Sequence, residues 1–97
     1  MNAPSSYQSG HRESSDTYRG EIFRHGRWRI IAGRCGIQWV LQFQARAGGP
    51  DRARWEARHY FRKRETAVRL WYSLTGEDGA ILAALLPERI GRPRNGA

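Results

Sequence analysis

The sequence of 97 residues has few of the residues that crosslink a chain or hold a metal, and no long apolar run. The single cysteine, Cys35, excludes an internal disulfide, and the three histidines do not have the spacing of zinc ligands. We therefore expect no cofactor and no structural metal. No stretch approaches the roughly 20 apolar residues that span a bilayer, and the first residues lack the apolar run of a secretory signal. These absences predict a cytoplasmic protein with no membrane partner.

Patterns of catalytic residues are also missing. The sequence has no glycine-rich phosphate loop, no paired-carboxylate signature and no triad pattern, so we expect a protein that is not an enzyme. Cys35 stands between Arg34 and Gly36 in a predicted turn. Such a thiol is either reactive or a spectator in a reducing cytoplasm, and the sequence leaves both interpretations open.

Basic residues, in contrast, are abundant. The chain has 17 Lys+Arg against 9 Asp+Glu, a formal net charge of +8, and every basic residue except Lys63 is arginine. A GC-rich genome also favours arginine over lysine, but it does not explain where the charge lies. Residues 19–64 hold twelve basic and three acidic residues, whereas the rest of the chain holds five basic and six acidic ones. An acidic partner is therefore expected for the first half of the folded region.

Composition divides the chain into three parts. Residues 1–17 are polar and have no apolar periodicity, so they cannot bury enough surface to offset their ordering entropy, and we predict a disordered segment. Residues 18–90 form a single predicted α+β domain. Residues 91–97, with the sequence GRPRNGA, are predicted to be a basic flexible tail.

Alternation of polar and apolar residues predicts about four strands in a small antiparallel meander. The first strand covers 18–24 and returns through a His25-Gly26 turn into 27–32, followed by strands at 37–46 and 54–61. In the last strand Trp55, Ala57, His59 and Phe61 fall on one face. We expect that face to be the core face.

A helical period follows the strands. Ala67, Leu70, Trp71 and Leu74 are spaced as one face of a helix, and Gly76 stands where that helix would end. Asp78 can cap a second short helix in which Leu82 and Leu86 belong to an apolar stripe before Pro87. The predicted fold class is therefore α+β, a small antiparallel sheet followed by two helices packed on one face.

The sheet face away from the helices should then be exposed and rich in arginine and glutamine. Glu56 is the only carboxylate expected there, so like charges would crowd unless an acidic partner relieves them. Arginine pairs with phosphates and glutamine bonds to base edges. The predicted partner-binding or nucleic-acid-binding residues are Arg24, Arg27, Arg29, Gln38, Gln42, Arg54, Arg58, Tyr60 and Arg62.

Three stretches, HGRWRIIAGRCGIQWVLQFQAR, WEARHYFRKRETAVRLW and ILAALLPERI, carry a resemblance. Over residues 18–90 the sequence resembles small uncharacterised proteins of proteobacterial prophages and other mobile elements. The resemblance implies an accessory protein that binds a host machine, as anti-CRISPR inhibitors do. Inhibitors that imitate DNA must be acidic, so a chain with a net charge of +8 is not a DNA mimic.

Two functions remain as hypotheses. The first is a non-enzymatic mobile-element protein, of the anti-CRISPR type, whose basic face binds an acidic protein of a nucleic-acid-handling complex resembling a CRISPR effector. The second is an accessory or regulatory protein that binds DNA or RNA directly. The small core also makes a homodimer a candidate, through a sheet edge or the second helix.

Overall fold

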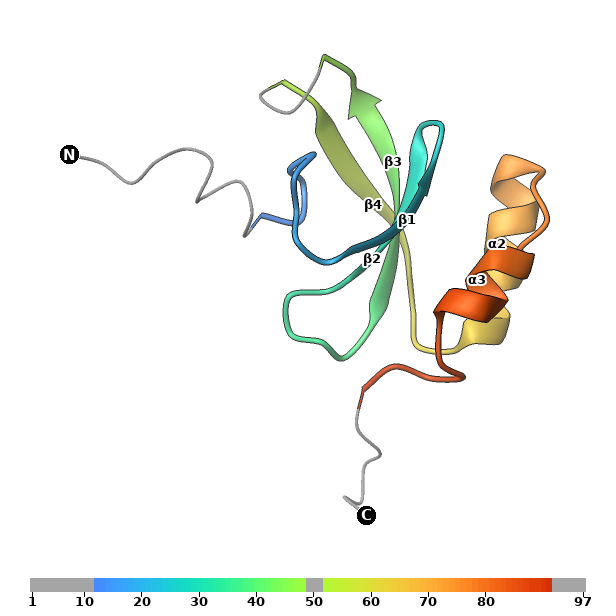
Figure 1. The fold of residues 1–97 in the computed structure, drawn as a ribbon. Coiled ribbons are helices and arrows are strands. Elements are labelled where there is room, and N and C mark those ends of the chain that lie inside the picture. Colours follow the sequence, from blue (N-terminus) through green and yellow to red (C-terminus); the bar gives the residue numbers. More distant parts are fainter. Residues whose placement is uncertain (1–11, 49–51, 92–97) are drawn as a thin grey trace.

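A computed structural model describes residues 12–48 and 52–91 as an antiparallel sheet with helices on one side (Figure 1). The sheet order is β1-β2-β3-β4, and each strand is antiparallel to its neighbour. The strands are β1 (Glu21–His25), β2 (Trp28–Ala32), β3 (Trp39–Arg46) and β4 (Arg54–Phe61), and the helices are α2 (Arg64–Thr75) and α3 (Ala80–Leu85). The predicted α+β meander followed by two helices is confirmed.

The β1–β2 hairpin turns one residue later than predicted. His25 lies opposite Trp28, so the two turn residues are Gly26 and Arg27 rather than His25 and Gly26. Only Gly26 of these two has a positive φ, 63°, which is the pattern of a hairpin turn with glycine in its first central position.

The helices cover one face of the sheet and form the main core with it. Strand residues such as Ile30, Trp39 and Leu41 pack with Trp71 of α2 and Leu82 of α3. Gly76 ends α2 in the left-handed conformation, with φ 77°, and its backbone N–H donates to the Tyr72 carbonyl. Neither helix, nor any other in the described residues, is long and apolar enough to cross a membrane.

Two bulges between β3 and β4 change the face that the end of β4 presents. Leu41 lies opposite His59 and Gln42 opposite Ala57, so Arg58 is an extra residue in β4. A bulge of one residue moves the following side chains to the other face. Phe61 therefore lies in the helix-side core, but Trp55 is buried on the opposite side, where its indole donates to Asp16. The prediction that Trp55 shares the core face with Phe61 was wrong.

Residues 12–17 lie on the sheet face opposite the helices, and this corrects the prediction that all of 1–17 is disordered (Figure 1). Ser15 is buried and forms a β-bridge with Arg54, and the backbone N–H of Trp55 donates to the Ser14 carbonyl. Tyr18 follows and packs in a second small core with Ile31 and Val40. Hydrogen bonds from sheet arginines order this polar segment, and composition alone does not reveal those bonds. Residues 1–11 and 92–97 lie outside the described residues.

Candidate functional site

Arg29 is the most completely bonded of the predicted site residues, and it is buried with 0% exposure. Its Nε donates to the Gln42 side chain at 2.6 Å, and Nη1 donates to Glu21 at 2.9 Å. The remaining guanidinium hydrogens donate to the backbone carbonyls of Asp16, Ser15 and Glu13 at 3.4, 2.8 and 2.9 Å. All five N–H donors of the guanidinium are therefore used within the chain.

Arg24 and Trp55 complete this buried arginine cluster, which we define as Arg24, Arg29, Gln42, Asp16, Glu21 and Trp55. Arg24 donates to the Asp16 and Glu21 carboxylates at 2.9 and 2.7 Å. Both guanidinium groups stack on Trp55, with Cζ 4.8 Å from the ring centroid for Arg24 and 4.4 Å for Arg29. Both guanidinium groups also donate to the same Glu21 oxygen, at 2.7 and 2.9 Å, and the Glu21 and Asp16 carboxylates balance the two like charges beside the indole ring.

The environment acts on the two guanidinium groups in opposite directions. Burial lowers the pKa of Arg29, and the bond to Glu21 offsets this only in part. Burial also acts to lower the pKa of Arg24, but the hydrogen bonds and charges of Glu21 and Asp16 outweigh it and raise that pKa. An arginine remains charged in both cases, so the cluster is ionic.

Three of the nine predicted binding residues, Arg24, Arg29 and Gln42, therefore belong to an internal cluster. Gln42 is 2% exposed, and its amide donates to the Glu13 carbonyl. The prediction that Arg29 and Gln42 are exposed was wrong because residues 12–17 supply the acceptors and cover them. A possible signal was the pair Glu13 and Asp16, two carboxylates just before the first strand of a basic sheet.

Three other predicted residues, Arg27, Arg54 and Arg58, come together at the sheet end that carries the β1–β2 and β3–β4 turns. The Cζ atoms of Arg27 and Arg58 each lie 4.9 Å from the ring centroid of Phe43. Arg54 is two residues from Glu56, which lies opposite Phe43, so Arg54 is on the Phe43 face of β4. Arg46 lies directly opposite Arg54 on that face. We call Arg27, Phe43, Arg46, Arg54 and Arg58 the arginine patch.

Within the described residues, the arginine patch has an excess of positive charge. Its four arginines are all exposed. Among the described residues, Glu56 is the one carboxylate within salt-bridge distance of them, 3.5 Å from Arg58. Arg27 is also held by donating to the Gln44 carbonyl at 2.6 Å. Phe43 and these contacts orient two guanidinium groups while leaving them accessible to an anion.

Gln38, Tyr60 and Arg62 lie toward the other end of the sheet, near the start of α2. Tyr60 is opposite Val40, a residue of the small core beneath Tyr18, so its ring is on the face away from the helices. It is 59% exposed. The structure therefore places the nine predicted residues in three groups and not on one continuous face.

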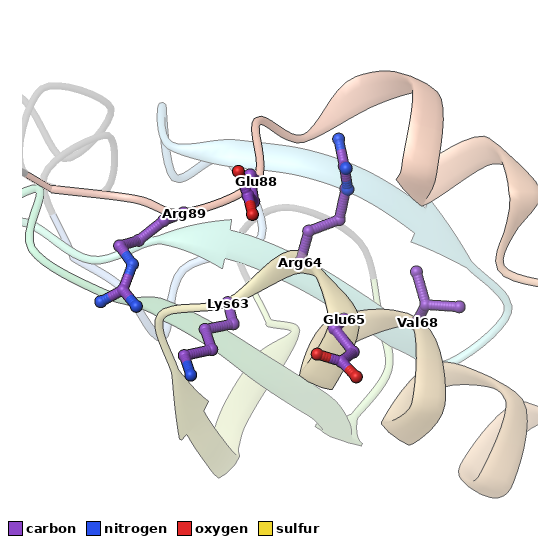
Figure 2. Close-up of a pocket in the computed structure, with 6 residues that line it drawn as sticks. All are labelled: Lys63, Arg64, Glu65, Val68, Glu88 and Arg89. Carbon is purple, nitrogen blue, oxygen red and sulfur yellow. The ribbon is translucent and has the colours of Figure 1, made fainter.

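An open pocket of about 510 Å³ lies where β4 leads into α2 (Figure 2). Lys63 and Arg89 are paired in an antiparallel bridge, and their side chains extend in the same direction. Arg64 extends the other way and donates to the Leu86 carbonyl at 3.2 Å. Glu65 and Glu88 also line the pocket, so its charge is mixed, unlike that of the arginine patch.

Comparisons with protein-family models, with curated proteins and with solved structures each found no match for this chain. The resemblance to mobile-element proteins gains no support from them, and the site is interpreted from its geometry.

Proposed function

We propose that the protein is a non-enzymatic, cytoplasmic accessory protein that binds an acidic surface in a nucleic-acid-handling complex through the arginine patch. The observation that supports this proposal most directly is the group of four exposed arginines, beside which the described part of the chain has one carboxylate, Glu56. Elsewhere on the sheet, the arginines that bond within the fold have acidic partners. Arg24 pairs with Asp16, and Arg29 pairs with Glu21. An external acidic partner would relieve the crowding of like charges in the patch.

The patch suits carboxylates or phosphates on a macromolecule. Guanidinium groups form bidentate bonds with both anions, and stacking on Phe43 holds two of them in place before binding. Less side-chain entropy is then lost when the partner binds. The sequence resemblance implies a mobile-element protein. In that context the proposed complex is a CRISPR effector, and the protein is an anti-CRISPR-type inhibitor that is not a DNA mimic.

A second candidate function is direct binding of single-stranded DNA or RNA. The exposed ring of Tyr60 favours it, because Tyr60 lies on the face away from the helices, with Arg62 two residues further along the chain, and offers a stacking surface beside that phosphate-binding group. The neutralised phosphates would release counterions, so affinity would fall steeply as salt rises.

The first experiment is charge reversal of the patch in the full chain, R27E/R46E/R54E/R58E. A matched control reverses four exposed arginines outside the patch, R12E/R19E/R69E/R89E, and so has the same net charge. Arg29 is left intact because its reversal would disrupt the buried arginine cluster. Pulldown against purified CRISPR effector complexes, with thermal melting of each variant, should show binding by the control and none by the patch variant. Equal binding by two folded variants would overturn the proposal.

Fluorescence anisotropy with labelled single-stranded DNA, single-stranded RNA and duplex DNA, in a salt series, tests the second candidate. We expect Tyr60→Ser to weaken single-strand binding by about tenfold, since stacking on an aromatic ring contributes about 1–3 kcal/mol per base. Tyr72→Ser, which replaces an equally exposed tyrosine on α2, is the control. Binding that is absent at low salt, or that does not change with salt, would exclude direct nucleic-acid binding.

A further inference from the structure

The helices carry a second unusual surface, away from the arginine patch. Four large apolar side chains of the two helices are exposed, Tyr72 and Leu74 on α2 and Ile81 and Leu85 on α3. Ile81 and Leu85 are each 50% exposed and lie one turn apart, so they share one face of α3. We call the exposed side of α3 that carries Ile81 and Leu85 the helix face.

The short helix α3 does not pack as its composition predicts. All six of its residues are apolar, yet Leu82 is the only one of them that is buried. A helix that covers a sheet normally presents polar side chains to water on its outer side. Isolated exposed apolar residues are common on proteins, but an outer helix side with no polar residue is typical of an interaction surface.

The segment that carries the helix face is acidic, unlike the rest of the chain. Residues 70–88 contain no lysine, arginine or histidine, although the chain has 17 Lys+Arg. The same residues contain Glu77, Asp78 and Glu88, and all three are exposed. Asp78 lies just before α3, where its carboxylate accepts from the Ala80 N–H, and Glu77 precedes it. Two exposed carboxylates therefore stand at the start of α3, whereas Glu88, after its end, lines the pocket of mixed charge.

We propose that the helix face binds a basic, amphipathic segment of a partner protein. Its apolar residues would pack on Ile81 and Leu85, and its lysines or arginines would approach Glu77 and Asp78 at the start of α3. Nucleic acid fits less well, because its phosphates would meet these two carboxylates. A second copy also fits less well than a basic segment, because it carries the same two carboxylates. This surface is separate from the arginine patch and does not depend on the function proposed for it.

The probe for this proposal is a synthetic peptide of leucine and lysine with leucines at helical i, i+3, i+4 spacing. Its control is a peptide of identical composition in scrambled order. Binding of each labelled peptide to the full-length protein is measured by anisotropy. We expect the patterned peptide to bind at least tenfold more tightly than the scrambled one, because only the patterned peptide presents one apolar face.

Variants of the protein locate the binding surface. I81S/L85S should weaken binding of the patterned peptide roughly tenfold or more, whereas Ile37→Ser, at a residue that is 49% exposed but outside the helices, should leave it unchanged. E77Q/D78N should weaken it severalfold and reduce its dependence on salt, and asparagine keeps the side-chain acceptor for Ala80.

Three outcomes would overturn the proposal. They are absence of binding, equal binding of the patterned and scrambled peptides, and binding that I81S/L85S does not change. Light scattering across protein concentrations adds a fourth test, since a dimer that I81S/L85S dissolves would show that a second copy occupies the helix face. None of these outcomes affects binding of an acidic partner at the arginine patch, which the charge-reversal variants test separately.

Discussion

Arg29 and Arg58 are the same residue type on the same sheet, and the structure treats them in opposite ways. Arg29 donates all five of its N–H groups to acceptors within the chain and stacks on the buried Trp55. Arg58 stacks on Phe43, reaches one carboxylate at 3.5 Å and remains exposed. The difference lies in the nearby acceptors, so a count of arginines on a face does not show whether that face binds a partner.

The largest expected effect comes from removing the internal arginine. Arg29→Met should lower the free energy of unfolding by about 3–5 kcal/mol, because Glu21, Gln42 and several backbone carbonyls lose their shared donor. Arg58→Met, the matched change in the arginine patch, should stay within about 0.5 kcal/mol of wild type. Urea denaturation of both variants measures the difference. Equal stabilities would show that the two regions do not differ as described.

The carboxylates of the two regions should also differ in how much they stabilise the fold, with the larger contribution in the buried arginine cluster. Asp16→Ala removes the carboxylate oxygen that accepts from Arg24 at 2.9 Å and from the Trp55 indole at 3.0 Å. We expect a loss of about 1–3 kcal/mol of stability, since the indole donor is buried and would lose its partner. Urea denaturation with tryptophan fluorescence follows this change. Stability equal to that of wild type would mean that Asp16 adds nothing to the cluster.

The smallest expected effect concerns affinity. Glu56→Gln removes the carboxylate that lies 3.5 Å from Arg58 in the arginine patch while keeping nearly the same shape. Stability should remain within about 1 kcal/mol, because exposed ion pairs contribute little. Affinity for an acidic partner should rise about two- to fivefold at low salt and less at high salt. Anisotropy or a quantitative pulldown can measure it, and a fall in affinity would show that Glu56 positions Arg58 for binding.

Strand and helix patterns made most of the fold predictable. The alternation in β3 and the helical spacing of Ala67 and Trp71 reflect one-sided burial, which acts on every residue of an element. The side of Trp55 was not predictable, because one extra residue, Arg58, shifts the alternation in β4. A bulge is set by local pairing with the neighbouring strand and leaves little trace in composition.

The candidate site was predictable only in part, for a related reason. Arg27, Arg54 and Arg58 were expected to be accessible and are exposed. Their face was predicted wrongly, because Phe43, which Arg27 and Arg58 contact, lies on the helix side of the sheet. Arg29 and Gln42 were assigned to the same surface because the polar residues 12–17 offered no apolar pattern that would place them on the sheet. Residues 12–17 hold Arg29 through their backbone carbonyls, which every residue has and which no sequence pattern distinguishes. Arg46 was missed because its pairing with Arg54 depends on the strand register.

The pairing of β4 with two short segments has a consequence for folding during synthesis. Ser14 and Ser15 pair with one end of this edge strand, and the segment around Arg89 pairs with Lys63 just beyond the other end. The second pairing joins Lys63, just before the two helices, to Arg89, just after them. It therefore cannot form until both helices and residue 90 have left the ribosome. Until then part of the sheet edge remains open, and an open edge is a site where nascent chains aggregate. The charges of β4 would keep neighbouring chains apart during that interval.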